Sequence, residues 1–177
     1  MKRGFSLRLR LYLLSAVPGL LTAMLIVLGA SNFQLSGISE FIPSFAVMAI
    51  FFWAIYVPKF MPQWFCLLLG IFQDAINGTV LGQSAVINLI LWGIIYSQRR
   101  FLIKESFPVL YGIFIITSLA ASGLQWLIFC LVTAKIFFSI SILIQWFFTA
   151  TFYPVIHLIF SRIYLAMVKN FRYVGWR

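Results

Sequence analysis

The stretch FPVLYGIFIITSLAASGLQWLIFCLV, residues 107–132, decides the fold class of this chain. It contains no charged residue, and its apolar residues run continuously instead of alternating with polar ones. A helix that crosses a bilayer needs about 20 apolar residues, whereas the strands of a membrane barrel alternate over about ten. Because backbone polar groups in lipid must be satisfied within a helix or a closed barrel, this stretch predicts a transmembrane helix.

The whole chain has the same character. Of its 177 residues, 63% are hydrophobic and 9% are charged, and the mean hydropathy is +1.06. Soluble domains are about 45–50% apolar and about 25% charged. The polar residues are too few to cover an apolar core, which excludes an ordinary soluble domain, a disordered chain and a nucleic-acid-binding domain of the usual composition. We therefore expect an all-α integral membrane protein.

Six apolar segments predict six transmembrane helices in a single membrane domain that covers residues 1–177. The expected helices are about 11–30, 41–57, 62–76, 80–96, 107–132 and 136–164. The third and fourth are short, and only Asn77, Gly78 and Thr79 separate them. Asn and Gly both tolerate positive φ, so a close helical hairpin is expected here. Pro154 is expected to kink the sixth helix.

The placement of charge predicts the orientation. Thirteen Lys and Arg residues oppose three acidic residues, for a formal charge of +10. The basic residues cluster at segment ends and form no stripe along one face, which favours a topology signal over nucleic-acid binding. With the N-terminus in the cytoplasm, Lys135 is the only basic residue outside. Both termini are therefore expected in the cytoplasm, unless the third and fourth segments form one re-entrant unit.

Asp74 is the only acidic residue inside an apolar segment, one turn before Asn77 and Gly78. A charge at the centre of a membrane helix costs about 2.5–3.5 kcal/mol on insertion scales, so this side chain should face protein or water. One interpretation is a binding or coupling residue. The favoured one is an acceptor for the free N–H groups that open the fourth helix, near Thr79–Leu81.

Small and polar residues surround this corner and recur in later segments. Gly70 lies four residues before Asp74, and Ser84 and Asn88 share a helical face, which predicts either helix packing or a polar patch with Asn77. A further polar face is expected in the fifth segment at Ser118, Ser122 and Gln125. The sixth carries a ridge that is either a helix–helix seam or a wet cavity. Its members are Ser141, Gln145, Thr149, Tyr153, His157 and Ser161.

The sequence offers no catalytic arrangement. It has no nucleophile paired with a base, no pair of carboxylates, no phosphate-binding glycine loop and no metal-ligand spacing. We expect no cofactor and no metal, and a binding or scaffolding role in place of an enzymatic one.

The sequence GIFQDAINGTVLG at 70–82 resembles the central motif of the MreD family of rod-shape-determining membrane proteins. That motif reads G-x-x-x-D, then a small polar turn with Gly, then L-G opening the next helix. The residues that match it are Gly70, Asp74, Gly78, Leu81 and Gly82. The layout of Pro43, Pro58 and Pro154 is also similar, and the resemblance covers roughly residues 41–162. Gln73 stands where the family usually has an apolar residue.

The resemblance implies a non-enzymatic, multi-pass protein of the bacterial inner membrane. It would belong to the cell-elongation complex (the elongasome), which controls rod cell shape and peptidoglycan synthesis. The implied partners are MreC, most directly, MreB, and RodA with its transpeptidase, besides membrane lipid. Arg99 and Arg100 are candidate cytoplasmic contacts or simply topology anchors. The candidate residues for the motif and for helix packing are Gly70, Asp74, Asn77, Gly78, Leu81, Gly82 and Asn88.

The family is also similar in fold to the substrate-binding subunits (S components) of energy-coupling vitamin transporters. This similarity implies an alternative function, a small-molecule binding subunit of a membrane transporter. That alternative requires a cavity lined by several polar groups and reachable from outside.

Overall fold

The computed structural model describes residues 16–29, 43–133 and 140–173. Within these ranges the chain forms six helices and no strand, so the expected all-α class is confirmed. The helices are Ala16–Gly29, α2 (Phe45–Tyr56), α3 (Gln63–Asn77), α4 (Gln83–Leu102), α5 (Phe107–Thr133) and α6 (Ile140–Tyr173). The outer parts of the expected first, second and sixth helices, at residues 11–15, 30, 41–42 and 136–139, lie outside the described residues.

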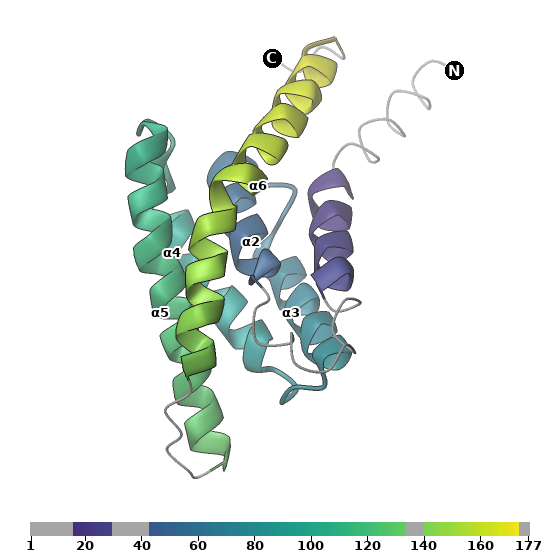
Figure 1. The fold of residues 1–177 in the computed structure, drawn as a ribbon. Coiled ribbons are helices and arrows are strands. Elements are labelled where there is room, and N and C mark those ends of the chain that lie inside the picture. The colour runs from purple at the N-terminus through teal and green to yellow at the C-terminus, as the bar shows by residue number, and fades with distance from the viewer. Residues whose placement is uncertain (1–15, 30–42, 134–139, 174–177) are drawn as a thin grey trace, which may run out of the picture.

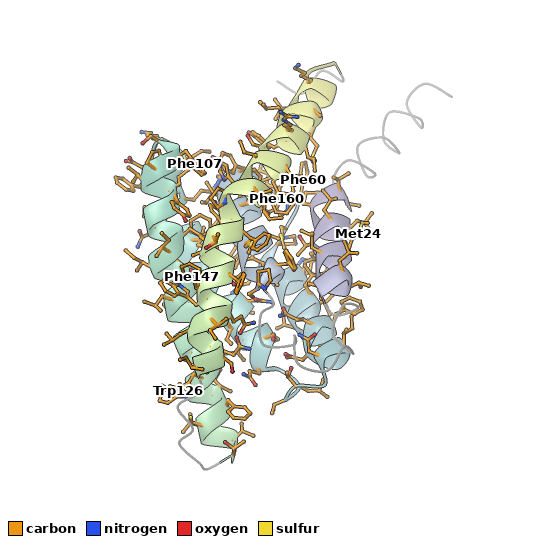
Figure 2. The ribbon with its side chains drawn as sticks, in the orientation of Figure 1. Met24, Phe60, Phe107, Trp126, Phe147 and Phe160 are labelled. Carbon is orange, nitrogen blue, oxygen red and sulfur yellow. The ribbon has the colours of Figure 1, made fainter. Side chains whose placement is uncertain are left out.

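α5 and α6 are the two helices long and apolar enough to cross a membrane within the described part of the chain. They pack side by side (Figure 1). Only 11% of the apolar window of α5 and 28% of that of α6 are buried in the protein. Phe147, on the outer side of α6 (Figure 2), is 61% exposed. Long helices with exposed apolar surfaces are stable in lipid and not in water, so the chain is an integral membrane protein.

α2 is apolar for a different reason. Every residue from Ala46 to Ile55 is buried, because α2 contacts α4, α5 and α6 and lies inside the bundle (Figure 1). Phe51 packs edge-on against Phe114 of α5 and Tyr153 of α6, with ring centroids 5.2 and 5.7 Å apart. A helix of twelve residues is about 18 Å long. The described α2 is therefore shorter than a bilayer core of about 30 Å and forms the centre of the protein.

Two helices extend beyond the ends that hydropathy predicts. The sequence predicts that the fourth helix ends near residue 96, but α4 continues to Leu102, so Arg99 and Arg100 lie in its last turn and not in a connecting segment. The predicted end of the sixth helix is near residue 164, but α6 continues to Tyr173. Hydropathy falls where charged residues begin, whereas backbone hydrogen bonding continues past that point. Basic residues also stabilise the negative end of a helix dipole.

Pro154 lies inside α6. A proline has no N–H, so the carbonyl oxygen of Ala150, four residues earlier, loses its helical donor. The hydroxyl of Tyr111 on α5 donates to this oxygen at 3.3 Å. Figure 1 shows that α6 changes direction along its course, and Pro154 supplies a cause for the bend. The neighbouring helix thus satisfies the carbonyl that the proline leaves free.

Candidate functional site: the α3–α4 hairpin and the polar pocket beside it

The turn between α3 and α4 depends on two glycines. Gly78 follows α3 with φ of 64°, and Gly82 precedes α4 with φ of 97°. Both values lie in the left-handed region that favours glycine. The expected reversal at Gly78 is confirmed, but the fourth helix begins at Gln83 and not at Val80. The positive φ of Gly82 is not helical, so α4 cannot extend back beyond Gln83. The turn therefore covers Gly78 to Gly82.

Asp74 caps the N-terminus of α4 from the end of α3. Its side chain is fully buried. The backbone N–H of Gly82 donates to its carboxylate at 2.9 Å, that of Ser84 at 3.1 Å, and the hydroxyl of Thr79 at 3.0 Å. A carboxylate at this position satisfies orphan donors and lies at the positive end of the helix dipole. The expected capping contact exists, with its backbone donors at Gly82 and Ser84 instead of Thr79–Leu81, because α4 begins later.

Gly70 brings the backbones of α3 and α4 into contact. A β-carbon on Gly70 would overlap the Cα of Ala85 and lie 2.9 Å from the carbonyl carbon of Ser84. No larger residue fits here unless the two helices separate. Gly70 and Asp74 thus hold the hairpin together, one by close approach and one by hydrogen bonds. The side chains of Asn77 and Leu81, in contrast, are exposed, and Leu81 is 70% exposed at the turn.

A small polar pocket lies between the hairpin and the other helices. Its volume is about 20 Å³. A cavity of this size holds about one water molecule. Two of its buried side-chain atoms, Nδ2 of Asn88 and Oε1 of Gln73, have no hydrogen-bond partner among the described residues. The structure therefore joins polar faces that lie far apart in the sequence. The main polar residues around the pocket are Gln73, Ser84, Asn88, Ser118, Gln125 and Thr149.

The polar ridge of α6 combines both expected features, because it forms contacts between helices and its member Thr149 also lines the small polar pocket. The hydroxyl of Thr149 accepts the backbone N–H of Ser44, next to α2, at 2.9 Å. His157 is buried, and its Nδ1 lies 3.2 Å from the hydroxyl of Tyr153. The rings of Phe52 and Phe107 pack against the imidazole, with centroids 5.2 and 4.8 Å away. His157 is thus part of an aromatic cluster and does not border the polar pocket.

Arg99 and Arg100 differ in their surroundings. The guanidinium Nε of Arg99 donates to the carbonyl oxygen of Ile55 at 2.6 Å. Ile55 is in the last turn of α2, where carbonyl groups lack helical donors. Arg99 therefore connects α4 to the end of the central helix. Arg100 is exposed at the same end of α4.

Comparison with known proteins identifies a family for most of the chain. A family model described as rod shape-determining protein MreD matches residues 10–163. The matched range contains the whole hairpin, α5 and most of α6. Searches of curated proteins and of solved structures gave no significant match.

Proposed function

This chain belongs to the MreD family of rod shape-determining membrane proteins, and we propose that it is a non-catalytic scaffold of the bacterial cell-elongation complex. The observation that carries this proposal is the family match over residues 10–163 of 177. The family is one of non-enzymatic, shape-determining membrane proteins. The scaffold would act in the inner membrane and contribute to rod cell shape by directing peptidoglycan synthesis.

The proposed direct partner is the transmembrane part of MreC. Through it the protein would connect the MreB filaments on the cytoplasmic side with RodA and its transpeptidase. The exposed faces of α5 and α6 would be the docking surfaces, since helices in lipid associate through van der Waals packing. Ile116 of α5 is 70% exposed, and Leu158 of α6 is 65% exposed. The exposed Arg100 is the proposed secondary contact on the cytoplasmic side.

The proposed topology has six membrane segments, both termini in the cytoplasm and the α3–α4 turn outside. The distribution of basic residues supports it, because Arg99 and Arg100 lie at the end of α4 opposite the turn. Leu81→Cys, made in a Cys130→Ser background, tests the topology, because Leu81 is exposed at the turn. A membrane-impermeant maleimide should label it in intact spheroplasts. Labelling only after the membrane is opened would contradict the proposed topology.

Depletion of the protein in its native cells tests the scaffold function. Depleted cells should become round, and the incorporation of wall precursors along the side wall should fall. Re-expression of the full chain should restore both properties. Cells that elongate normally as rods without the protein would rule out the proposed role.

A second candidate function is a solute-binding subunit of a transporter. One observation favours it, a pocket of about 410 Å³ beside the α3–α4 turn, lined partly by Gln83, Gln125 and Gln145. Sites for small organic molecules usually have volumes of about 300–1,000 Å³. Purified protein that carried a solute into vesicles would favour this function over the scaffold.

A further inference from the structure

One face of α6 beyond Pro154 carries apolar and basic residues in alternation. At 3.6 residues per turn, four exposed residues of this half of the helix fall within an arc of about 60°. They are Leu158, Arg162, Leu165 and Lys169, and we call them the basic stripe of α6. The two leucines are 65% and 55% exposed. The stripe therefore presents two cations and two large apolar side chains on the same surface.

The opposite face of this half of α6 packs against the protein. The ring of Phe160 lies 5.1 Å from that of Trp53 in α2, measured between centroids, and both side chains are buried. The ring of Tyr164 lies 5.3 Å from that of Tyr56 at the end of α2. Met167 is also buried. These contacts fix the rotation of the helix, so the basic stripe faces away from the central helix α2.

The stripe lies where α6 leaves the hydrocarbon of the bilayer. The described helix begins at Ile140, and Arg162 follows about 22 residues later, which corresponds to about 33 Å. The hydrocarbon core of a bilayer is about 30 Å thick, with a headgroup layer of about 5–8 Å on each side. Lys169 lies about 10 Å further along the helix. Helical side chains point back toward the N-terminus of their helix, so the ammonium of Lys169 extends back toward the headgroup layer.

The protein supplies no anion to this stripe in the part of the chain that the structure describes. Arg162 and Lys169 form no ion pair with a described carboxylate. The carboxylate of Asp74 accepts hydrogen bonds from the first turn of α4. Glu105, the other described acidic residue, lies in the loop between α4 and α5. Two exposed cations at headgroup depth thus have charge complementarity with an anion that comes from outside the chain.

The apolar members of the stripe select the kind of anion. A soluble anion would contact Arg162 and Lys169 and leave Leu158 uncovered. A lipid with a zwitterionic head would bring a positive group close to the two cations together with its phosphate. An anionic phospholipid meets both requirements, because its phosphate complements the cations and its acyl chains cover the apolar part of the helix. Each basic residue near an anionic leaflet raises affinity about fivefold.

We propose that the basic stripe of α6 binds an anionic phospholipid. The phosphate lies between Arg162 and Lys169, and an acyl chain follows the exposed side of α6 past Leu158 toward Phe147, which Figure 2 shows on the outer side of the helix. With the proposed topology this lipid belongs to the cytoplasmic leaflet. The site goes beyond the proposed scaffold function and does not require a protein partner.

Native mass spectrometry of the purified full-length protein tests the proposal. The protein is reconstituted in nanodiscs of phosphatidylcholine with phosphatidylglycerol as the probe, then released into mild detergent. The wild-type protein should retain phosphatidylglycerol over phosphatidylcholine by about tenfold or more, since two cations contribute. The double variant Arg162→Gln/Lys169→Gln should reduce this preference about fivefold or more. Equal retention of the two lipids by the wild type would overturn the proposal.

A matched double variant separates the stripe from the overall charge. Lys59 and Lys104 are exposed in the α2–α3 and α4–α5 loops. These loops lie at the same end of the bundle as this half of α6, as Phe60, Phe107 and Phe160 show in Figure 2. Lys59→Gln/Lys104→Gln removes the same charge and should change the lipid preference less than about twofold. Equal loss in the two double variants would assign the preference to net charge and overturn the site.

An exchange of the two cations tests whether charge at these positions is sufficient. Arg162→Lys/Lys169→Arg keeps both charges on the stripe and should keep the preference for phosphatidylglycerol within about twofold. The preference should also fall as the salt concentration rises, because the pairing is exposed to water and screened by ions. A preference that the exchange abolishes, or that salt leaves unchanged, would contradict an electrostatic site for the phosphate.

Two further outcomes would assign the stripe to another occupant. Inorganic phosphate that displaces phosphatidylglycerol at the same concentration would identify a soluble anion and overturn the lipid assignment. A co-purified acidic polypeptide that Arg162→Gln/Lys169→Gln removes and Lys59→Gln/Lys104→Gln keeps would also overturn it. Lipid retention is measured on the isolated protein, so its result is independent of whether depleted cells lose their rod shape.

Discussion

The carboxylate of Asp74 lies 3.1 Å from the backbone nitrogen of Ser84, so an acidic side chain of one membrane helix caps the first turn of the next. This contact explains how a chain with three acidic residues tolerates one of them in an apolar segment. The carboxylate oxygens accept hydrogen bonds from backbone N–H groups, and the carboxylate lies at the positive end of the α4 dipole. The contact also joins the two helices at the point where the chain reverses, so the hairpin geometry depends on it.

Asp74→Leu should therefore destabilise the protein by about 2 kcal/mol, because the N–H groups of Gly82 and Ser84 lose their acceptor. Asp74→Asn should cost less, since the amide keeps one acceptor oxygen. The free energy of unfolding is measured in detergent micelles titrated with sodium dodecyl sulfate. Glu105→Leu is the control, because Glu105 lies in the loop between α4 and α5. An Asp74→Leu variant as stable as Glu105→Leu would show that the cap contributes nothing.

Gly70→Ala tests the contact between the backbones of α3 and α4. The added methyl overlaps Cα of Ala85. The hairpin then has to open, at a cost of about 1–3 kcal/mol. Gly112→Ala adds the same methyl to open space on α5 and should be neutral or slightly stabilising. Thermal unfolding followed by tryptophan fluorescence compares the two variants. Equal midpoints would mean that the helices do not approach as closely as the structure describes.

Gly78→Ala and Gly82→Ala separate backbone strain from packing. At neither position does an added β-carbon meet an atom of the described residues within 4 Å. Any loss therefore comes from positive φ alone, at about 1–2 kcal/mol for each variant. Gly93→Ala is the matched control, because Gly93 lies in the interior of α4 with equally open space. Its replacement should raise stability slightly through better helix propensity. The same thermal unfolding assay compares these variants. An unchanged unfolding midpoint for Gly82→Ala would contradict the left-handed conformation at this position.

Alanine substitutions of Arg99 and Arg100 should distinguish a residue that stabilises the fold from a residue that contacts a partner. Arg99→Ala removes the donor to the carbonyl of Ile55. The loss of this charged hydrogen bond should lower stability by about 1–2 kcal/mol. Arg100→Ala should leave the unfolding midpoint unchanged, because that side chain is exposed. If Arg100 contacts a cytoplasmic partner, its variant should instead weaken rescue of rod shape in depleted cells. Similar stability losses in the two variants would mean that both residues are structural.

The sequence was sufficient for those features that depend on neighbouring residues. Asp74, Gly78 and Gly82 lie within nine residues of one another, so their hairpin could be predicted from local spacing. The interior position of α2 could not be predicted, because a helix surrounded by apolar protein and a helix surrounded by lipid have the same composition. Hydropathy also places the end of α4 too early, at the residues before Arg99.

The polar pocket was the main feature that the sequence did not reveal. Asn88, Ser118 and Thr149 were visible as separate polar positions on three segments. Their convergence depends on the rotation of each helix about its axis. In segments that are apolar on nearly every side, the sequence pattern does not define that rotation. For the same reason the sequence did not predict the pocket beside Gln83 and Trp126. Residues from four parts of the chain line this pocket.

The most direct test of the scaffold function is photo-crosslinking in native membranes. A photoreactive amino acid replaces exposed residues, Ile116 on α5, Leu158 on α6 or Leu81 at the turn, and replaces buried Phe114 as the control. The scaffold function predicts that at least one exposed position crosslinks to MreC and that Phe114 does not. If no exposed position captures MreC while the protein is folded and the cells are rod-shaped, the central claim is contradicted.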